Sequence, residues 1–497
     1  MSVLIGLDVG TTGARAIAVD DRGNVVASAS AEYPMLSPQP GWTEQHPADW
    51  WQGSREVLSR VASEVGGHVA GVGLTGQMHG SVFLDQAGAV VRPALLWNDQ
   101  RTAEQCETIT ERIGAERLIE ITGNPALTGF QAPKILWLRD VEPVQYRHVR
   151  HVLLPKDYVR FLLTGEFATD VSDASGTLLL DVRRRAWSAQ ILAALEIPPE
   201  WLPTVHESPE QTGALSPAIA AELGLPPGIP VAAGGGDNAA AAIGTGIVER
   251  GRISSSIGTS GVLFAHADAL AIDPSGRLHA FCHAVPQQYH LMAVTLSAGA
   301  SLRWWRDILG GRMTYDDLSE LAASAPPGSD GLFFLPYLTG ERTPHLDPNA
   351  RGAFVGLRAH HSKAHLTRAV MEGVVFSLRD GLDIMRGLGV DVQHARATGG
   401  GGRSGFWRQL QADIFNLPVE RTVADEGPAY GAALLGGVAA GIYKDVHEAA
   451  TQVRLAEGIS EPDAELARRY EGLYSTFKQL YPALHSREPA MAGRVPI

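Results

Sequence analysis

The chain has 497 residues, of which 45% are hydrophobic and 19% charged, a composition typical of a globular protein of two or three domains. Its 41 basic and 54 acidic residues give a net charge of −13 without a dense basic run, which argues against a nucleic-acid-binding or membrane-surface protein. Two cysteines, Cys106 and Cys282, cannot form a disulfide framework, and the N-terminus lacks a signal-peptide pattern. We therefore expect a cytoplasmic protein with no nucleic-acid partner and no membrane association.

The first thirty residues predict three strands joined by two turns. Apolar side chains alternate over residues 3–7 and are followed by Asp8, and Gly-Thr-Thr-Gly at 10–13 predicts a tight turn. A second strand is expected over 16–19 and a third over 25–27.

The same pattern returns in the second half of the chain. A strand is expected over 253–257, a turn at 258–261, a second strand over 262–264 and a further strand over 291–296. The Thr-Thr-Gly of the first turn is matched by Thr259-Ser260-Gly261. This repetition predicts an internal duplication.

The remaining periodic segments complete a mixed α/β pattern. Apolar spacing predicts helices and strands between and after the two repeats. The expected helices are 49–65, 103–113, 365–385, 406–415 and 427–441, and the expected strands are 69–74, 81–84 and 90–96. We divide the chain into a first lobe at 1–245, a second lobe at 246–445, and a helical extension at 446–497 with a loose tail from Arg487.

The turn at 10–13 has the chemistry of a phosphate site. Consecutive glycine and threonine residues present backbone N–H groups and hydroxyls to one point, and Asp8 at the strand end is suited to hold the Mg²⁺ that accompanies a triphosphate. The alternative is an ordinary hairpin with a solvated aspartate. The second turn at 258–261 favours the phosphate site, because two turns can hold a polyphosphate from two sides.

Asp237 follows three glycines, residues 234–236, at the expected start of a helix. One interpretation is that Asp237 caps that helix. The other is that its carboxylate, in a glycine-walled cleft, acts as the general base for an attacking hydroxyl. Both roles can coexist.

Two further stretches suggest ligand contacts. The glycine run at 398–404 precedes a helix and suits adenosine or phosphate, although it could be a plain flexible loop. The turn at 76–80 carries Met78 and His79, and a polar stretch lies at 97–99, where Trp97, Asn98 and Asp99 suit a polyol. The alternative for His79 is a loop histidine with its hydrogen bonds satisfied.

These motifs together resemble the FGGY carbohydrate kinases, over residues 5 to about 441. The second family signature is met by Gly-Ala-Phe-Val-Gly-Leu at 352–357, His-Leu at 365–366 and Ala-Val-Met-Glu at 369–372. The first signature is met in part by Lys-Ile-Leu-Trp-Leu at 134–138. Gln131 departs from the small residue or proline usual three positions before Lys134.

Within the family the likeness is to the kinases of D-xylulose, whereas glycerol kinases carry Arg-Glu in place of Met78-His79. The stretches that carry this likeness are 76–80, 96–99, 154–158, 172–177, 236–239 and 337–344.

The resemblance implies two RNase-H-like lobes of the actin/hexokinase/Hsp70 ATPase type around a central cleft, with ATP and Mg²⁺ as cofactors and a pentulose as substrate. It implies that Asp237 is the catalytic base and that Asp8 supports the metal and the activity. The implied sugar contacts are Met78 and His79, to which we add Trp97, Asn98, Asp99 and Asn238. The implied nucleotide contacts are Thr11, Thr12, Thr259, Gly299, Gly400 and Ser404.

Several alternatives stay open from the sequence. Arg303 stands where glycerol kinases have a glutamine, and we leave it out of the site. A kinase of ribulose, glycerol or another polyol is the main alternative. An actin- or Hsp70-like ATPase is disfavoured, because no β-rich client-binding block follows Gly441. A homodimer is kept open.

Overall fold

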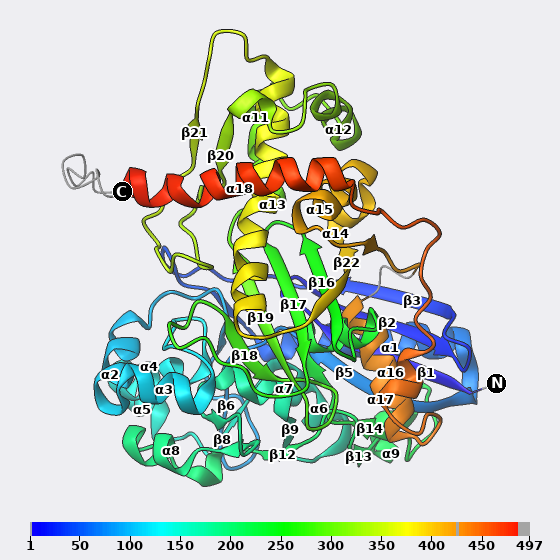
Figure 1. The fold of residues 1–497 in the computed structure, drawn as a ribbon. Helices are drawn as coiled ribbons and strands as arrows, with labels where there is room; N and C mark the ends of the chain where they lie inside the picture. The colour runs from blue at the N-terminus through cyan, green and yellow to red at the C-terminus, as the bar shows by residue number, and fades with distance from the viewer. Residues whose placement is uncertain (1, 424–426, 486–497) are drawn as a thin grey trace.

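The computed structural model describes residues 2–423 and 427–485, so the tail expected from Arg487 lies outside the described residues. Each half of the chain is built on a mixed β-sheet (Figure 1). Among the described residues, no helix is both long and apolar enough to cross a membrane.

The first sheet has the strand order β13-β14-β5-β1-β2-β3, with β15 beside the end of β5. β1 pairs antiparallel with β2 and parallel with β5, and β2 pairs antiparallel with β3. The strands are β1 Val3–Val9, β2 Gly13–Asp20, β3 Val25–Glu32, β5 Val69–Gly76, β13 Gln211–Ala214, β14 Pro230–Ala232 and β15 Gly235–Gly236. The three opening strands are confirmed.

The second sheet has the order β18-β19-β17-β16-β22-β23 and repeats the pattern of the first. β16 pairs antiparallel with β17 and parallel with β22, as β1 pairs with β2 and β5, and β17 pairs antiparallel with β19. The strands are β16 Gly251–Ile257, β17 Gly261–Ala267, β18 His279–Cys282, β19 Tyr289–Thr295, β22 Val392–Thr398 and β23 Val419–Glu420. This shared topology agrees with the predicted duplication.

Helices cover both faces of the first sheet. Alternate residues of β1 point to opposite faces. Ile5 lies in the core with Trp50 and Val57 of α1 (Pro47–Val65), whereas Leu4 lies with Ala433 of α16. α6 (Pro155–Thr164) and α9 (Pro217–Leu223) lie on the α1 side, and α10 (Asp237–Gly244) packs against α16.

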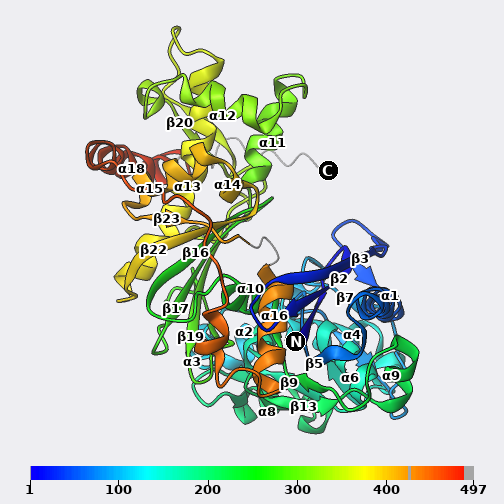
Figure 2. The ribbon, with the colours of Figure 1, turned by 90° about the vertical axis from the view of Figure 1, so that its right-hand side faces the viewer.

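α16 (Gly427–Ala439) comes from the far end of the chain and yet packs on the first sheet (Figure 2). The approach is so close that a Cβ added at Gly73 of β5 would collide with the carbonyl of Ala432, and one added at Gly431 would collide with the carbonyl of Ala240. Glycine permits this backbone-to-backbone contact because it has no side chain. The helix expected at 427–441 is thereby confirmed, and it joins the two halves of the chain.

Further elements lie outside the two main sheets, and their short strands pair into separate two-stranded sheets. Beside the first lie α2 Ala103–Ile113, α3 Ala115–Thr122, α4 Gln131–Val141, α5 Pro143–Tyr146, α7 Val171–Ala174, α8 Ala189–Leu195 and the short strands β4 Glu44–Gln45, β6 Val82–Leu84, β7 Ala94–Leu95, β8 His151–Leu153, β9 Ala168–Asp170, β10 Leu180–Asp181, β11 Ala186–Trp187 and β12 Thr204–His206. Beside the second lie α11 Gly299–Ile308, α12 Tyr315–Ala323, β20 Phe333–Leu335, β21 Ala353–Val355, α13 Lys363–Gly387, α14 Gly399–Arg403, α15 Gly405–Phe415 and α18 Ala464–His485, with α17 Val446–Ala450 after α16. The strand expected over 90–96 is shorter than predicted, since only β7 forms there.

Candidate active site

Three strand segments of the first sheet end at one edge. β1 pairs with β5 through Asp8 and Thr75, and β15 pairs with β5 through Gly235 and the same Thr75. Adjacent strands lie about 4.8 Å apart, so Asp8 and Asp237 reach this edge from either side of β5. β5 itself continues there into the turn 77–79. The fold thus brings together the expected base, the expected metal residue and the expected sugar turn.

Asp8 and Asp237 are carboxyl groups whose pKa values are both raised. Burial, reinforced by the negative charge of Asp237 and opposed by Arg15, raises the pKa of Asp8 to about 7. Burial raises the pKa of Asp237 to about 6, although hydrogen bonds from Asn238 oppose the rise. A carboxyl group with a pKa near neutrality suits proton transfer at physiological pH.

Asp237 is the first residue of α10, but its side chain does not cap the helix. Its Oδ1 accepts hydrogen bonds from the backbone N–H and the Nδ2 amide of Asn238, at 2.7 and 2.8 Å. The capping interpretation would require a bond to the second or third backbone N–H of the helix. The contacts seen instead orient the carboxylate and leave Oδ2 for a ligand.

Asp8 fits a metal ligand by its unused acceptor. Among the residues that the structure describes, its buried Oδ1 has no hydrogen-bond partner. A buried acceptor without a partner is costly unless a ligand satisfies it. Carboxylate oxygen is the donor type that Mg²⁺ prefers, so the residues present fit this ion.

The turn at 10–13 is closed by a bond from the Gly10 N–H to the Gly13 carbonyl, 3.0 Å. Three side chains hold it from outside. Tyr33 donates to the Gly10 carbonyl at 2.6 Å, Gln45 donates to the Thr11 carbonyl at 2.7 Å, and Trp97 donates from Nε1 to Thr11 Oγ1 at 3.0 Å. The turn is therefore rigid before any ligand binds.

Met78 and His79 lie where two glycines leave room for them. A Cβ added at Gly236 would lie 2.9 Å from Met78 Sδ, and one added at Gly176 would lie 2.6 Å from His79 Nδ1. Met78 therefore packs on the backbone next to Asp237, which supports the predicted closeness of the sugar turn to the base.

His79 is a neutral imidazole with a defined tautomer. Its Nδ1 lies 2.6 Å from the Gly176 carbonyl, which can only accept, so Nδ1 carries the proton and Nε2 is an acceptor. Burial, with the nearby charges of Lys134 and Arg342, lowers the pKa of His79 to about 3. Its φ of 68° lies in the left-handed region, and Lys134 holds this turn by donating to the His79 carbonyl at 3.2 Å.

The stretch 97–99 divides into different roles. Trp97 is 43% exposed and holds the phosphate turn, while the buried Oδ1 of Asn98 has no partner among the described residues. Asp99 is fully buried, and Arg101 and the Thr43 N–H engage its two oxygens. Asp99 therefore lies behind the site, where it supports its neighbours.

A buried network stabilises the strand that carries Asp237. The Gly236 N–H donates to Ser172 Oγ at 3.2 Å, and Ser172 donates to Asp170 Oδ2 at 2.5 Å. Asp170 in turn forms an ion pair of 3.0 Å with Lys156. Lys156 and Ser172 belong to the stretches 154–158 and 172–177, so the structure gives those motifs a supporting role.

The expected nucleotide contacts of the second half come together around one cavity of about 400 Å³. Thr259, Gly299, Gly400 and Ser404 all line it. Arg303, which we had left out, also lines it. Thr11 and Thr12 do not line this cavity, because they belong to the turn of the first sheet.

A second cavity, of about 310 Å³, lies next to the nucleotide cavity. Asp237 and Asn238 line it on one side, and Ser256 and Thr398 line it on the other. Arg403 lines both this cavity and the larger one. Asp237 thus lines a cavity that neighbours the nucleotide cavity.

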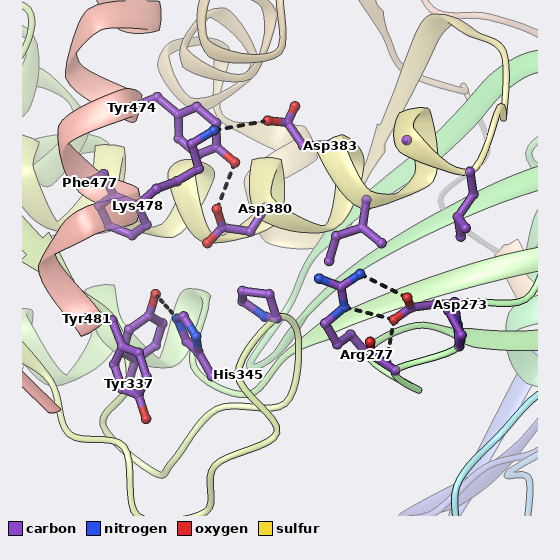
Figure 3. A pocket seen from close by; sticks show the side chains of 16 residues that line it. Asp273, Arg277, Tyr337, His345, Asp380, Asp383, Tyr474, Phe477, Lys478 and Tyr481 are labelled. Carbon is purple, nitrogen blue, oxygen red and sulfur yellow. Dashed lines mark hydrogen bonds and ion pairs between the residues drawn. The ribbon is translucent and has the colours of Figure 1, made fainter. Parts of the chain in front are cut away.

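A cavity of about 540 Å³ lies elsewhere, between α13, α18 and the loop at 337–345 (Figure 3). Its polar side chains are engaged with one another: Arg277 pairs with Asp273 at 2.9 Å, and Tyr474 donates to Asp380 at 2.7 Å. None of the expected site residues lines it.

Comparison with known proteins identifies the family. Residues 3–244 match the N-terminal domain of the FGGY family of carbohydrate kinases, and residues 253–440 match its C-terminal domain. The xylulose kinases of Escherichia coli (strain K12) and Lactococcus lactis are each 42% identical to this chain, covering 97% of it and 99% and 97% of their own lengths.

A solved structure from Brucella ovis, described as a xyloylose kinase, is 40% identical and superimposes with a TM-score of 0.92 over 97% of this chain and 99% of its own. The glycerol kinase of Plasmodium falciparum, 21% identical, shares the fold with a TM-score of 0.88. The chain therefore belongs to the FGGY family of carbohydrate kinases and has the family's two-domain α/β fold.

Proposed function

We propose that the chain transfers the γ-phosphoryl group of ATP to the terminal hydroxyl of D-xylulose, giving D-xylulose 5-phosphate. The observation that carries this is the position of Asp237, which lines a cavity next to the nucleotide cavity, with Arg403 in the wall of both. The similarity to xylulose kinases over nearly the whole chain supports the choice of sugar.

In this mechanism Asp237 is the general base. Its carboxylate orients the terminal hydroxyl and accepts its proton as the oxygen attacks the γ-phosphorus in line. Met78 and the neutral His79 contact the sugar, Asn98 donates to or accepts from its hydroxyls, and Asn238 holds the base in place.

The nucleotide is assigned to the second lobe. Gly299, Gly400 and Ser404 lie along it, and Thr259 contacts its phosphates with Thr11 and Thr12 from the other side. The division into lobes at 1–245 and 246–445 with an extension at 446–497, the homodimer and the cytoplasmic location remain predictions from the sequence.

Asp8 would hold Mg²⁺. When bound, the ion would neutralise negative charge on the phosphates of ATP. The protein's own contribution there is a carboxylate whose buried oxygen has no other partner among the described residues.

The test is ATP consumption by the purified protein with D-xylulose, D-ribulose, L-ribulose or glycerol. We expect D-xylulose to give the highest kcat/KM, at least tenfold above the others. A higher value for a ribulose or for glycerol would assign the enzyme to that substrate. ATP hydrolysis that no sugar stimulates would contradict sugar kinase activity and favour an actin- or Hsp70-like ATPase.

A further inference from the structure

Arg342 belongs to the other half of the chain, and its charge acts on His79 of the sugar turn. It lies in the long loop between β20 and β21, and the side chain of Glu341 anchors that loop by accepting bonds from Thr295 Oγ1 at 2.5 Å and from the Leu296 N–H at 3.0 Å. Thr343 adds a backbone bond to Val294 at 3.0 Å. Arg342 is therefore held on both sides by β19 and its continuation.

The guanidinium of Arg342 contacts a histidine that ties the two halves together. Its Nη1 lies 3.3 Å from His279 Nε2, and His279 Nδ1 lies 2.7 Å from Asn124 Oδ1. Because the Asn124 oxygen only accepts, His279 donates from Nδ1 and accepts from Arg342 at Nε2. Asn124 also donates to the Ala280 carbonyl at 3.1 Å.

The guanidinium of Arg342 forms no direct ion pair among the described residues, although the charge of Glu341 acts on it from the same loop. Within residues 2–423 and 427–485, its guanidinium forms no ion pair, and the bond to His279 is its one side-chain hydrogen bond. It is nevertheless only partly exposed. A partly buried arginine is ordinarily paired with an acidic group, so its remaining N–H groups are available to a ligand.

Arg342 and His79 lie near the same cluster of aromatic rings. The charge of Arg342 contributes to the low pKa of His79, and Phe130 stands between His79 and His279 with ring-centre distances of 4.8 and 6.0 Å. The region thus offers an acceptor at His79 Nε2 and charged donors at Arg342. An α-hydroxyketone requires this pair, since its carbonyl accepts and its adjacent hydroxyl donates.

We infer that Arg342 is a specificity-determining residue that donates to the C2 carbonyl oxygen of a ketopentose, while His79 Nε2 accepts from a neighbouring hydroxyl. A polyol lacks the carbonyl and gains less from the guanidinium. This inference rests on the proposed function, whose sugar it concerns.

A phosphate contact is the competing role for an unpaired arginine. The contacts of Arg342 disfavour it, because the residue lines neither the nucleotide cavity nor the cavity at Asp237. Its partners, His279 and the His79 region, lie on the sugar side.

The experiment compares wild type, Arg342→Gln and Arg342→Lys. KM and kcat are measured for D-xylulose and ATP, and inhibition constants are measured for xylitol and D-arabinitol, the two polyols that differ from D-xylulose only at C2. We expect Arg342→Gln to lower kcat/KM for D-xylulose about ten- to hundredfold, mainly through KM. The inhibition constants of the polyols and the KM for ATP should change less than threefold. Arg342→Lys keeps the charge and should lose less.

Arg277→Gln is the matched control, because Arg277 lies close to the same loop but pairs with Asp273 and is 39% exposed. It should leave all constants unchanged. Equal losses for ketose and polyols, or an increase in the KM for ATP alone, would overturn the inference. If Arg342→Gln does not fold, the inference is tested by Arg342→Lys, through the ratio of its KM for D-xylulose to its inhibition constants for the polyols. If wild type phosphorylates no ketopentose, the proposed function fails instead, and isothermal titration of D-xylulose onto wild type and the variants still tests the contact.

Discussion

Asp8 and Asp237 approach one edge of the first sheet from either side of β5, and burial, reinforced by the charge of Asp237, raises the pKa of Asp8 to about 7. Two partly buried carboxylates that repel each other are unfavourable in the resting protein. Each carboxyl group has a function once the ligands are bound: Asp8 as a metal ligand and Asp237 as a base.

Replacing Asp237 with Asn should lower kcat at least a hundredfold, because the amide cannot accept the proton of the attacking hydroxyl. ATP binding, measured by isothermal titration, should change less than threefold. Asp21→Asn, an exposed position on the β2–β3 turn, is the control and should keep full activity. More than a few per cent of wild-type turnover in Asp237→Asn would refute the base assignment.

Asp8 gives a stability prediction with a defined sign. Its folded pKa of about 7 exceeds the unfolded value near 3.8, so its contribution to stability is present at low pH and is lost as the pH rises through 7. Asp8→Asn should therefore increase the free energy of unfolding by about 1–3 kcal/mol at pH 8, relative to wild type without metal, and by less at pH 5. Urea denaturation at both pH values measures this difference.

The same variant should be inactive, so that stability and activity change in opposite directions. A gain that is equal at pH 5 and pH 8 would show that the carboxyl titration is not its cause. A loss of stability at pH 8 would contradict the buried, repelled state of Asp8.

Two substitutions of Trp97 should distinguish its hydrogen bond to Thr11 from the contact of its ring with the sugar. Trp97→Phe removes the Nε1 donor to Thr11 Oγ1 but keeps an aromatic face, so kcat/KM for ATP should fall about two- to tenfold with the sugar KM unchanged. Trp97→Ala should also raise the KM for D-xylulose. Steady-state kinetics with each substrate varied in turn checks both. An identical effect of the two variants on the sugar KM would exclude a role for the ring.

Replacing glycine with alanine should have opposite effects on stability at two helical positions, because only one of them lies where α16 approaches α10. Gly431→Ala places a Cβ against the Ala240 carbonyl and should destabilise the protein by about 2–4 kcal/mol. Gly472→Ala in α18 meets open space and should stabilise it by about 0.5–1 kcal/mol. Thermal unfolding of both variants checks the sign. A neutral Gly431→Ala would contradict the backbone contact.

Local patterns allowed most of the fold to be predicted from the sequence. The paired strand-turn-strand openings at Asp8 and Ser256 and the long helix α13 depend on alternation and helical spacing, which neighbouring residues determine. The strand expected over 90–96 is shorter in the structure, because only two of its residues pair with another strand, β4.

The supporting contacts of the site could not be predicted in the same way. Tyr33 and Gln45 hold the phosphate turn from positions that carry no motif, and Arg342 arrives from a different half of the chain. Such contacts depend on tertiary packing. Arg303 was excluded from the site because glycerol kinases have a glutamine at this position. It nevertheless lines the nucleotide cavity, so a difference in residue type was not a sound reason to exclude it.

The position of α16 has a consequence for biosynthesis. The first sheet lacks the cover of one face until residues 427–439 have been made, although its own strands are complete by residue 236. On the ribosome, the N-terminal half must therefore wait with an apolar surface exposed while roughly two hundred more residues are added. The two halves mature as one unit, and an isolated N-terminal half is expected to aggregate.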